Sequence, residues 1–131
     1  MIMNKRLFRD TAILFVVIGV LDFLANKLYL YWTTWWMDMI LHFLSGGVVA
    51  MTVILVLSSL SWLSRRHVIA SVIFSVLTVG LVWELFELWF EVTSLADGIV
   101  YWTDTSSDIF LDLLGGFLGM KYSFYILNKH E

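Results

Sequence analysis

The sequence predicts an all-α protein, specifically a four-helix transmembrane bundle with both termini in the cytoplasm. Of its 131 residues, 60% are hydrophobic and only 15% are charged, whereas a soluble domain has about half apolar and roughly a quarter charged residues. The apolar residues lie in long blocks, and the mean hydropathy is +0.86. These observations exclude a soluble domain and a disordered chain. The net charge of −3 also excludes a basic nucleic-acid binder.

We expect one integral membrane domain covering residues 1–131. A membrane-spanning helix needs about 20 mostly apolar residues, and four stretches meet this need, at about 7–30, 37–60, 68–90 and 108–127. The first follows a basic N-terminal segment and resembles a signal peptide. However, no small-residue cleavage site follows it, so a first transmembrane helix is expected. The longest break, from Glu91 to Ser107, is expected to be an outer loop.

The distribution of charge predicts the topology. Seven of the eight basic residues fall at the ends that four spans place on one side: Lys5, Arg6, Arg9, Arg65, Arg66, Lys121 and Lys129. The positive-inside rule makes that side cytoplasmic. Nine of the eleven carboxylates fall in the outer halves of the helices or in the outer loops. The sequence therefore predicts an acidic cluster toward the external face of a bacterial cytoplasmic membrane.

Each predicted helix carries a polar side chain at a similar depth. His42 lies six residues beyond Trp36, which is about 9 Å of helix. Glu84, Asp112 and Asp22 lie at comparable depths on the other helices. Ionisable groups are costly in lipid, so they face the bundle interior and indicate function. We therefore expect these side chains to converge.

The spacing within each helix strengthens this expectation, because residues three or four apart share a helix face. Asp38 and His42 are four residues apart, and Glu84 and Glu87 are three apart. Asp104, Asp108 and Asp112 form a row in which neighbours are four residues apart. So many carboxylates need either protonation or a cation among them. We hypothesise a divalent metal site with Asp38 or Asp104 behind the ligands or on the substrate side. The expected ligands are His42, Glu84, Glu87, Asp108 and Asp112.

One imidazole with several carboxylates favours Zn²⁺, Mn²⁺ or Fe²⁺ over Mg²⁺ or Ca²⁺. The simpler alternatives stay open: His42 as a hydrogen-bonded interhelical residue, Asp97 as a solvated loop residue, and Asp22 with Asn26 and Lys27 as an internal polar patch.

The small residues Gly115 and Gly119, like Gly46 and Ala50, lie four apart. They predict close helix packing.

The first functional hypothesis is a metal-dependent hydrolase or transferase acting on a lipid-linked or cell-envelope substrate at the outer leaflet. Glu87 and Asp38 are its candidate catalytic carboxylates. Asp104, Tyr101 and Trp102 are its candidate substrate-side residues, on a loop that serves as a lid. The alternatives are a proton- or cation-binding or transport protein, and a non-catalytic structural or accessory protein. Membrane lipids are the expected partners, nucleic acid is not, and a homo-oligomer is left open.

Three elements in this order resemble the VanZ-like and YjdF-like families of small polytopic bacterial membrane proteins. They are His42-Phe43-x-x-Gly46, Trp83-Glu84-x-x-Glu87 and Asp104-Thr105-x-x-Asp108-x-x-x-Asp112-x-x-Gly115. The resemblance covers roughly residues 36–120. VanZ-like proteins usually carry an Asn near position 112 and an Arg before the Asp row, so the YjdF-like branch is favoured. The resemblance implies a multi-pass inner-membrane protein and names no substrate.

Overall fold

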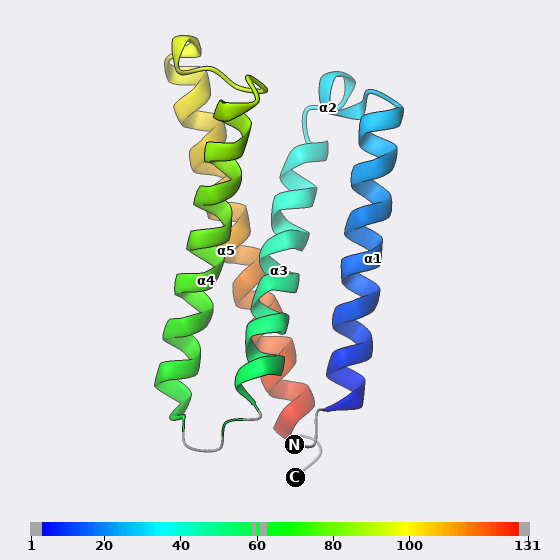
Figure 1. Cartoon of the computed structure of the whole chain (residues 1–131), viewed down its shortest axis with the longest axis vertical. Helices are drawn as coiled ribbons and strands as arrows, with labels where there is room; N and C mark the ends of the chain where they lie inside the picture. The colour runs from blue at the N-terminus through cyan, green and yellow to red at the C-terminus, as the bar shows by residue number, and fades with distance from the viewer. Residues whose placement is uncertain (1–3, 59, 61–62, 129–131) are drawn as a thin grey trace.

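The computed structural model describes residues 4–58, 60 and 63–128. Every regular element in this part of the chain is helical, which confirms the predicted all-α class. The elements are α1 (Lys5–Lys27), α2 (Leu30–Thr33), α3 (Met37–Leu57), α4 (Arg65–Trp89), the 3₁₀ turn η1 (Leu95–Asp97) and α5 (Ile99–Asn128). The four long helices lie side by side. The start of α1 and the end of α5 share one end of the bundle, while α2 lies at the other (Figure 1).

Three of the described helices, α3, α4 and α5, are long and apolar enough to cross a membrane. The sequence predicts α1 as a fourth span. With 23 residues α1 has a sufficient length, but it carries Arg9, Asp10 and Asp22 within that length, and it is not among the three. The membrane-spanning character of α3, α4 and α5 is thus supported, and that of α1 stays a prediction.

The predicted loop over 91–107 is wrong for residues 99–107, because α5 already begins at Ile99; residues 91–98 do connect the two long helices. The hydroxyl groups of this polar segment are satisfied within the helix: Thr103, Ser106 and Ser107 each donate to the carbonyl four residues earlier. Such bonds let Ser and Thr occupy a helix. Tyr101, Trp102 and Asp104 therefore lie on the first turns of α5 and not on a lid loop.

The other helix boundaries differ from the prediction by a few residues. The first helix ends at Lys27, and Tyr29 follows with a left-handed backbone (φ 55°) that turns the chain into α2. The third helix ends at Leu57. The fourth begins at Arg65, since the side chain of Ser64 accepts a hydrogen bond from the backbone of His67 and caps the helix.

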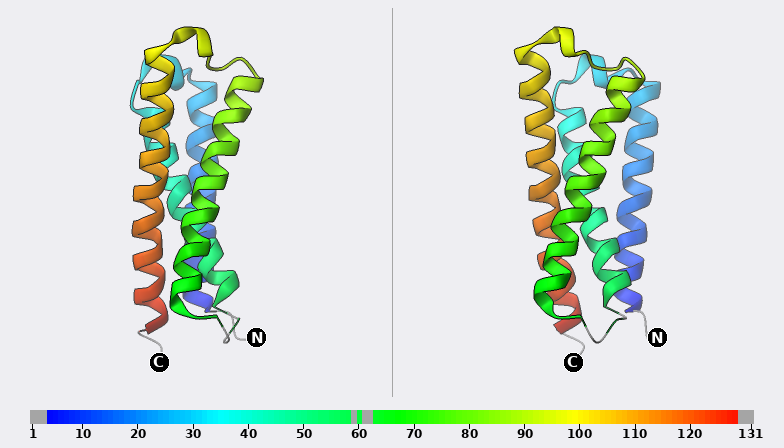
Figure 2. Two further views of the ribbon diagram at one scale, coloured as in Figure 1. Left: turned by 90° about the vertical axis from the view of Figure 1, so that its left-hand side faces the viewer. Right: turned by 60° about the vertical axis from the view of Figure 1, so that its left-hand side comes forward.

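Helix α3 is the centre of the bundle. It packs most extensively on α5, and α1 and α4 flank it. Helix α5 runs the full length of the bundle (Figure 2). A side-chain carbon at Gly46 would overlap the backbone carbonyl of Asp112, and one at Gly115 would overlap that of Phe43. These glycines thus let the two backbones touch, as the small-residue spacing predicts.

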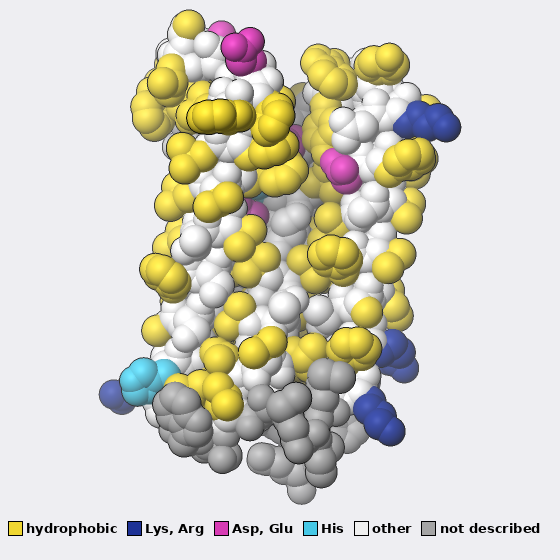
Figure 3. Space-filling view, in the orientation of Figure 1, with side chains coloured by type: hydrophobic (Ala, Val, Ile, Leu, Met, Phe, Trp, Pro, Cys, Tyr) yellow, Lys and Arg dark blue, Asp and Glu magenta, His cyan; other side chains and the backbone are white. Residues whose placement is uncertain are grey.

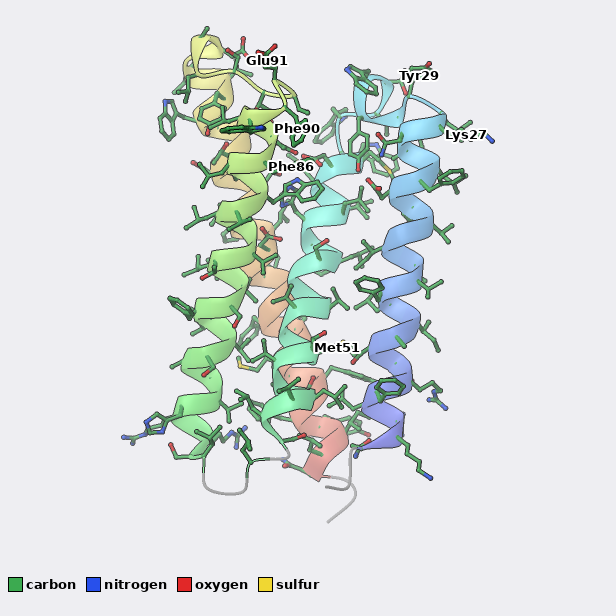
Figure 4. All side chains as sticks on the ribbon, viewed as in Figure 1. Lys27, Tyr29, Met51, Phe86, Phe90 and Glu91 are labelled. Carbon is green, nitrogen blue, oxygen red and sulfur yellow. The ribbon has the colours of Figure 1, made fainter. Side chains whose placement is uncertain are left out.

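One half of the bundle, which contains the start of α1 and the end of α5, is filled with apolar side chains. Among them are Leu7, Ala50, Met51, Ile54 and Ile126. Figure 4 shows Met51 in this half, far from Tyr29 and Glu91 at the opposite end. The outer surface is also largely apolar (Figure 3). A bundle that is apolar on its surface suits a lipid environment. Its buried ionisable side chains are His42, Glu84, Glu87, Asp108 and Asp112.

Candidate functional site

The site is a group of polar side chains buried in the half of the bundle that lies toward α2. Four of them are almost inaccessible, with exposed fractions of 4% for His42, 4% for Glu84, 1% for Asp108 and 5% for Asp112. Asp38 is partly exposed. Three helices supply them: α3 gives Asp38 and His42, α4 gives Glu84, and α5 gives the other two. The expected convergence is present for His42, Glu84 and Asp112. Asp22, expected with them, instead accepts hydrogen bonds from Asn26 and Tyr31.

His42 lies at the centre and uses its two nitrogens differently. Nδ1 lies 3.2 Å from Asp112 Oδ2, and with the proton on Nδ1 this nitrogen donates to the carboxylate. Nε2 then carries a free lone pair. It lies 3.8 Å from Asp38 Oδ2 and 4.0 Å from Glu84 Oε1. Both separations exceed the range of a hydrogen bond.

Among the described residues, Asp38, His42 and Asp108 form a group that could hold a metal ion, since each offers a ligand atom within 4.8 Å of the others. Three buried atoms here have no hydrogen-bond partner: His42 Nε2, Glu84 Oε1 and Asp108 Oδ1. A buried polar atom without a partner costs about 1–3 kcal/mol. Three such atoms lie close together in this group, on His42, Glu84 and Asp108.

Thr105 positions Glu84. Its hydroxyl donates to Glu84 Oε2 over 2.6 Å, so that oxygen is satisfied and Oε1 remains for a ligand. Thr105 is a site residue that the sequence pattern alone does not predict. The signal that could have found it is its place between Asp104 and Asp108, one residue after the acid that begins the row.

The remaining predicted site residues have different surroundings. Glu87 is buried, and its Oε1 accepts a 2.9 Å hydrogen bond from the indole of Trp83. Asp104 and Trp102 are exposed, whereas Tyr101 is buried. Asp38, expected behind the ligands or in catalysis, is instead next to His42 Nε2. Asp112, expected as a ligand, is paired with the opposite ring nitrogen.

A cleft of about 270 Å³ leads to His42 from the side of the bundle between α1 and α4. Acidic side chains are visible in the hollow between these helices (Figure 3). At the α2 end, the hydroxyl of Tyr31 donates to Asp22 Oδ1 over 2.6 Å. The lining residues are Phe15, Ile18, Gly19, Asp22, Tyr31, Asp38, Leu41, His42, Ser45, Val79, Gly80, Trp83 and Asp112.

Comparison with protein families agrees with the membrane architecture. The family described as "Predicted membrane protein (DUF2238)" matches residues 3–129. The chain belongs to this family. No curated protein and no solved structure matches it. The family description supports a small multi-pass membrane protein and assigns no activity to the residues around His42.

Chemically, the arrangement combines one imidazole lone pair with several carboxylate oxygens in a buried, cleft-connected position. Imidazole and carboxylate together are ligands for borderline divalent metals. The bond from His42 Nδ1 to Asp112 fixes the ring orientation, which is how metal-binding histidines are commonly held. The site can therefore bind a cation, and the cleft gives other molecules access to it.

Proposed function

We propose that this membrane protein binds a divalent metal ion through Asp38, His42 and Asp108, with Glu84 as a further carboxylate ligand. The observation that carries the proposal is the set of unpartnered buried atoms on His42, Glu84 and Asp108. A cation would satisfy the imidazole lone pair and the carboxylate oxygens together. Asp112 would hold the imidazole and not contact the metal.

The distances favour a metal over protonated carboxylates. A proton shared between His42 Nε2 and Glu84 Oε1 needs a separation of about 2.7–3.2 Å, and the two atoms are 4.0 Å apart. Two ligands bound at about 2.0–2.2 Å from one ion lie roughly 3.0–3.6 Å apart. The observed separations of 3.8 and 4.0 Å need only a small contraction to reach that range. One nitrogen with carboxylates favours Zn²⁺, Mn²⁺ or Fe²⁺.

Metal content tests this proposal directly. The protein is purified in detergent without chelators, and its metals are measured by elemental analysis. About one equivalent of Zn²⁺, Mn²⁺ or Fe²⁺ per chain is expected. His42→Ala and Asp108→Asn should lose it, and Asp97→Asn, an exposed residue of η1, should keep it. A folded wild-type protein without a stoichiometric divalent metal would contradict the proposal.

The proposal extends to chemistry at the outer leaflet, namely metal-dependent hydrolysis or transfer on a lipid-linked or cell-envelope substrate. It is supported by the cleft beside His42 and by Glu87, a buried carboxylate near the ligands that is available as a general base. The alternative of proton or cation transport is less favoured, because the inner half of α3 packs in an apolar core around Ala50, Met51 and Ile54. Glu87→Gln should retain metal and lose the activity or phenotype of the protein.

The orientation and location are part of the same proposal. Lys5, Arg6, Arg9, Arg65 and Arg66 lie toward the end of the bundle where α1 begins and α5 ends, and Lys129 lies outside the described residues. We place that end in the cytoplasm of a bacterium. The order of sequence elements that resembles VanZ-like and YjdF-like proteins remains a resemblance, and it is consistent with an inner-membrane location.

A further inference from the structure

We propose that the cleft between α1 and α4 binds a membrane-embedded amphiphile that carries an ammonium group, with its hydrocarbon chain toward the lipid and its polar end beside Asp38 and His42. This inference rests on the proposed function in one respect only, namely that Asp38 and His42, beside which the polar end would lie, are metal ligands. Its ligand class follows from the cleft itself.

The cleft opens sideways toward the hydrocarbon region. Its side walls are Phe15, Ile18 and Gly19 on α1 and Val79 and Gly80 on α4, which are apolar or small residues. Helices α1 and α4 share no extensive contact within the described residues, so the opening between them runs along the bundle. With α1 and α4 both in the membrane, as proposed, this opening would face the bilayer.

A hydrogen bond between α2 and α1 borders the cleft. Tyr31, from α2, lines the cleft and donates its 2.6 Å hydrogen bond to Asp22 of α1. Burial, followed by this hydrogen bond to Asp22, raises the pKa of Tyr31 above its usual range, so the hydroxyl remains a donor at neutral pH. Apolar walls together with this polar border suit an amphiphile better than a fully water-soluble ligand.

The charge of the lining residues favours a cationic polar end. Asp22, Asp38 and Asp112 contribute three carboxylates, and no Lys or Arg is present among the described residues that line the cleft. An anionic headgroup would meet repulsion there. The aromatic rings of Tyr31 and Trp83 also line the cleft, and aromatic rings together with carboxylates attract ammonium groups.

A buried atom without a hydrogen-bond partner lies at the cleft beside the acidic residues. His42 is 4% exposed and lines the cleft, and its Nε2 has no hydrogen-bond partner. The polar end of a bound amphiphile would thus lie next to the metal ligands. This geometry brings a bond close to the polar end within reach of the proposed metal.

Photo-cross-linking tests the inference. The full chain is placed in phosphatidylcholine nanodiscs with a long-chain primary amine that carries a diazirine in its alkyl chain, and cross-linked residues are mapped by mass spectrometry. Cross-links are expected on the lining residues of the two helices, namely Phe15, Ile18 and Gly19 on α1 and Val79, Gly80 and Trp83 on α4. Unlabelled tetradecylamine at about ten times its Kd should reduce them about tenfold by mass action, and tetradecyl sulfate should not.

Two variants make the test specific. Gly19→Trp should abolish the cleft cross-links by filling it, because a side chain at Gly19 meets open space. Val16→Trp, at an exposed α1 position outside the cleft lining, is its matched control and should retain them. Asp22→Asn should weaken competition by the amine about tenfold, as expected for loss of one charge-assisted contact. If Gly19→Trp fails to fold, the Asp22→Asn variant still tests the inference.

Equal competition by amine and sulfate, or unchanged cross-links in Gly19→Trp, would overturn the inference. Cross-linked dimers formed through these residues would show a second copy in the cleft and would also overturn it. The experiment is run with added Zn²⁺ and with chelator, and metal content is measured separately. Amine-selective cross-linking in a protein without metal would retain the cleft and reject only the metal site.

Discussion

His42 Nδ1 and Asp112 Oδ2 lie 3.2 Å apart, although 70 residues separate them along the chain. This contact fixes the imidazole so that its other nitrogen faces Asp38 and Glu84. Partners of this kind usually contribute 10–100-fold to metal affinity. Asp112→Asn should therefore weaken metal binding by about 10–100-fold, without abolishing it as His42→Ala does. Competition with a fluorescent Zn²⁺ chelator measures the difference, and equal loss in both variants would instead make Asp112 a ligand.

Gly80 leaves room for the carboxylate of Asp112. A side-chain carbon at Gly80 would lie 2.5 Å from Asp112 Oδ2 and 3.0 Å from Ile109 Cδ1. Gly80→Ala should therefore displace Asp112, lower metal affinity, and cost about 1–3 kcal/mol of stability, as overpacking does. Gly19→Ala is the control, because nothing lies within 4 Å of its added carbon. If both variants bind metal like the wild type, the position of Asp112 does not control the site.

The contact between α3 and α5 should be intolerant of larger residues at Gly115. A side chain there would collide with the backbone carbonyl of Phe43, and backbone cannot move aside as a flexible side chain can. We expect Gly115→Ala to cost about 3 kcal/mol or more, measured by SDS-induced unfolding in mixed micelles. Gly47→Ala should be nearly neutral, since its nearest neighbour would be at 3.5 Å. A comparable loss in both variants would contradict this prediction.

The proposed topology is tested with single cysteines, because the chain has none of its own. Cysteines at Asp97 and at Arg65 lie at opposite ends of α4 and its following loop. With the positive-inside orientation, a membrane-impermeant maleimide added outside spheroplasts should label Asp97→Cys and not Arg65→Cys. Labelling after lysis controls for reactivity. The reverse pattern would place the termini outside.

The sequence predicts the fold class well because the physical reason is local to each helix. Long apolar stretches can only be buried or lie in lipid. Helices α3 and α4 follow them closely, whereas α5 begins nine residues before its predicted stretch, at Ile99 instead of residue 108. The segment 99–107 fails as a loop prediction because Ser and Thr favour loops only when their hydroxyls lack a helical acceptor, and those of Thr103, Ser106 and Ser107 find one. The amino-acid composition of a segment does not reveal whether its hydroxyl groups will donate to backbone carbonyls of a helix.

The site is predictable in part. Depth and helical spacing indicate that His42, Glu84, Asp108 and Asp112 belong together. They do not indicate which ring nitrogen each acid faces, because that depends on how far every helix is rotated about its own axis. Glu87 illustrates the limit: it shares a helix face with Glu84, yet its Oε1 binds the indole of Trp83 on its own helix.

The glycine contacts between α3 and α5 have a mechanical consequence. Because the two backbones touch at the level of Gly46 and Asp112, the imidazole and the carboxylate that orients it move as one rigid body. Helices α1 and α4 lie against that body from either side. A shift of either flanking helix would change what can approach the imidazole while leaving its orientation intact.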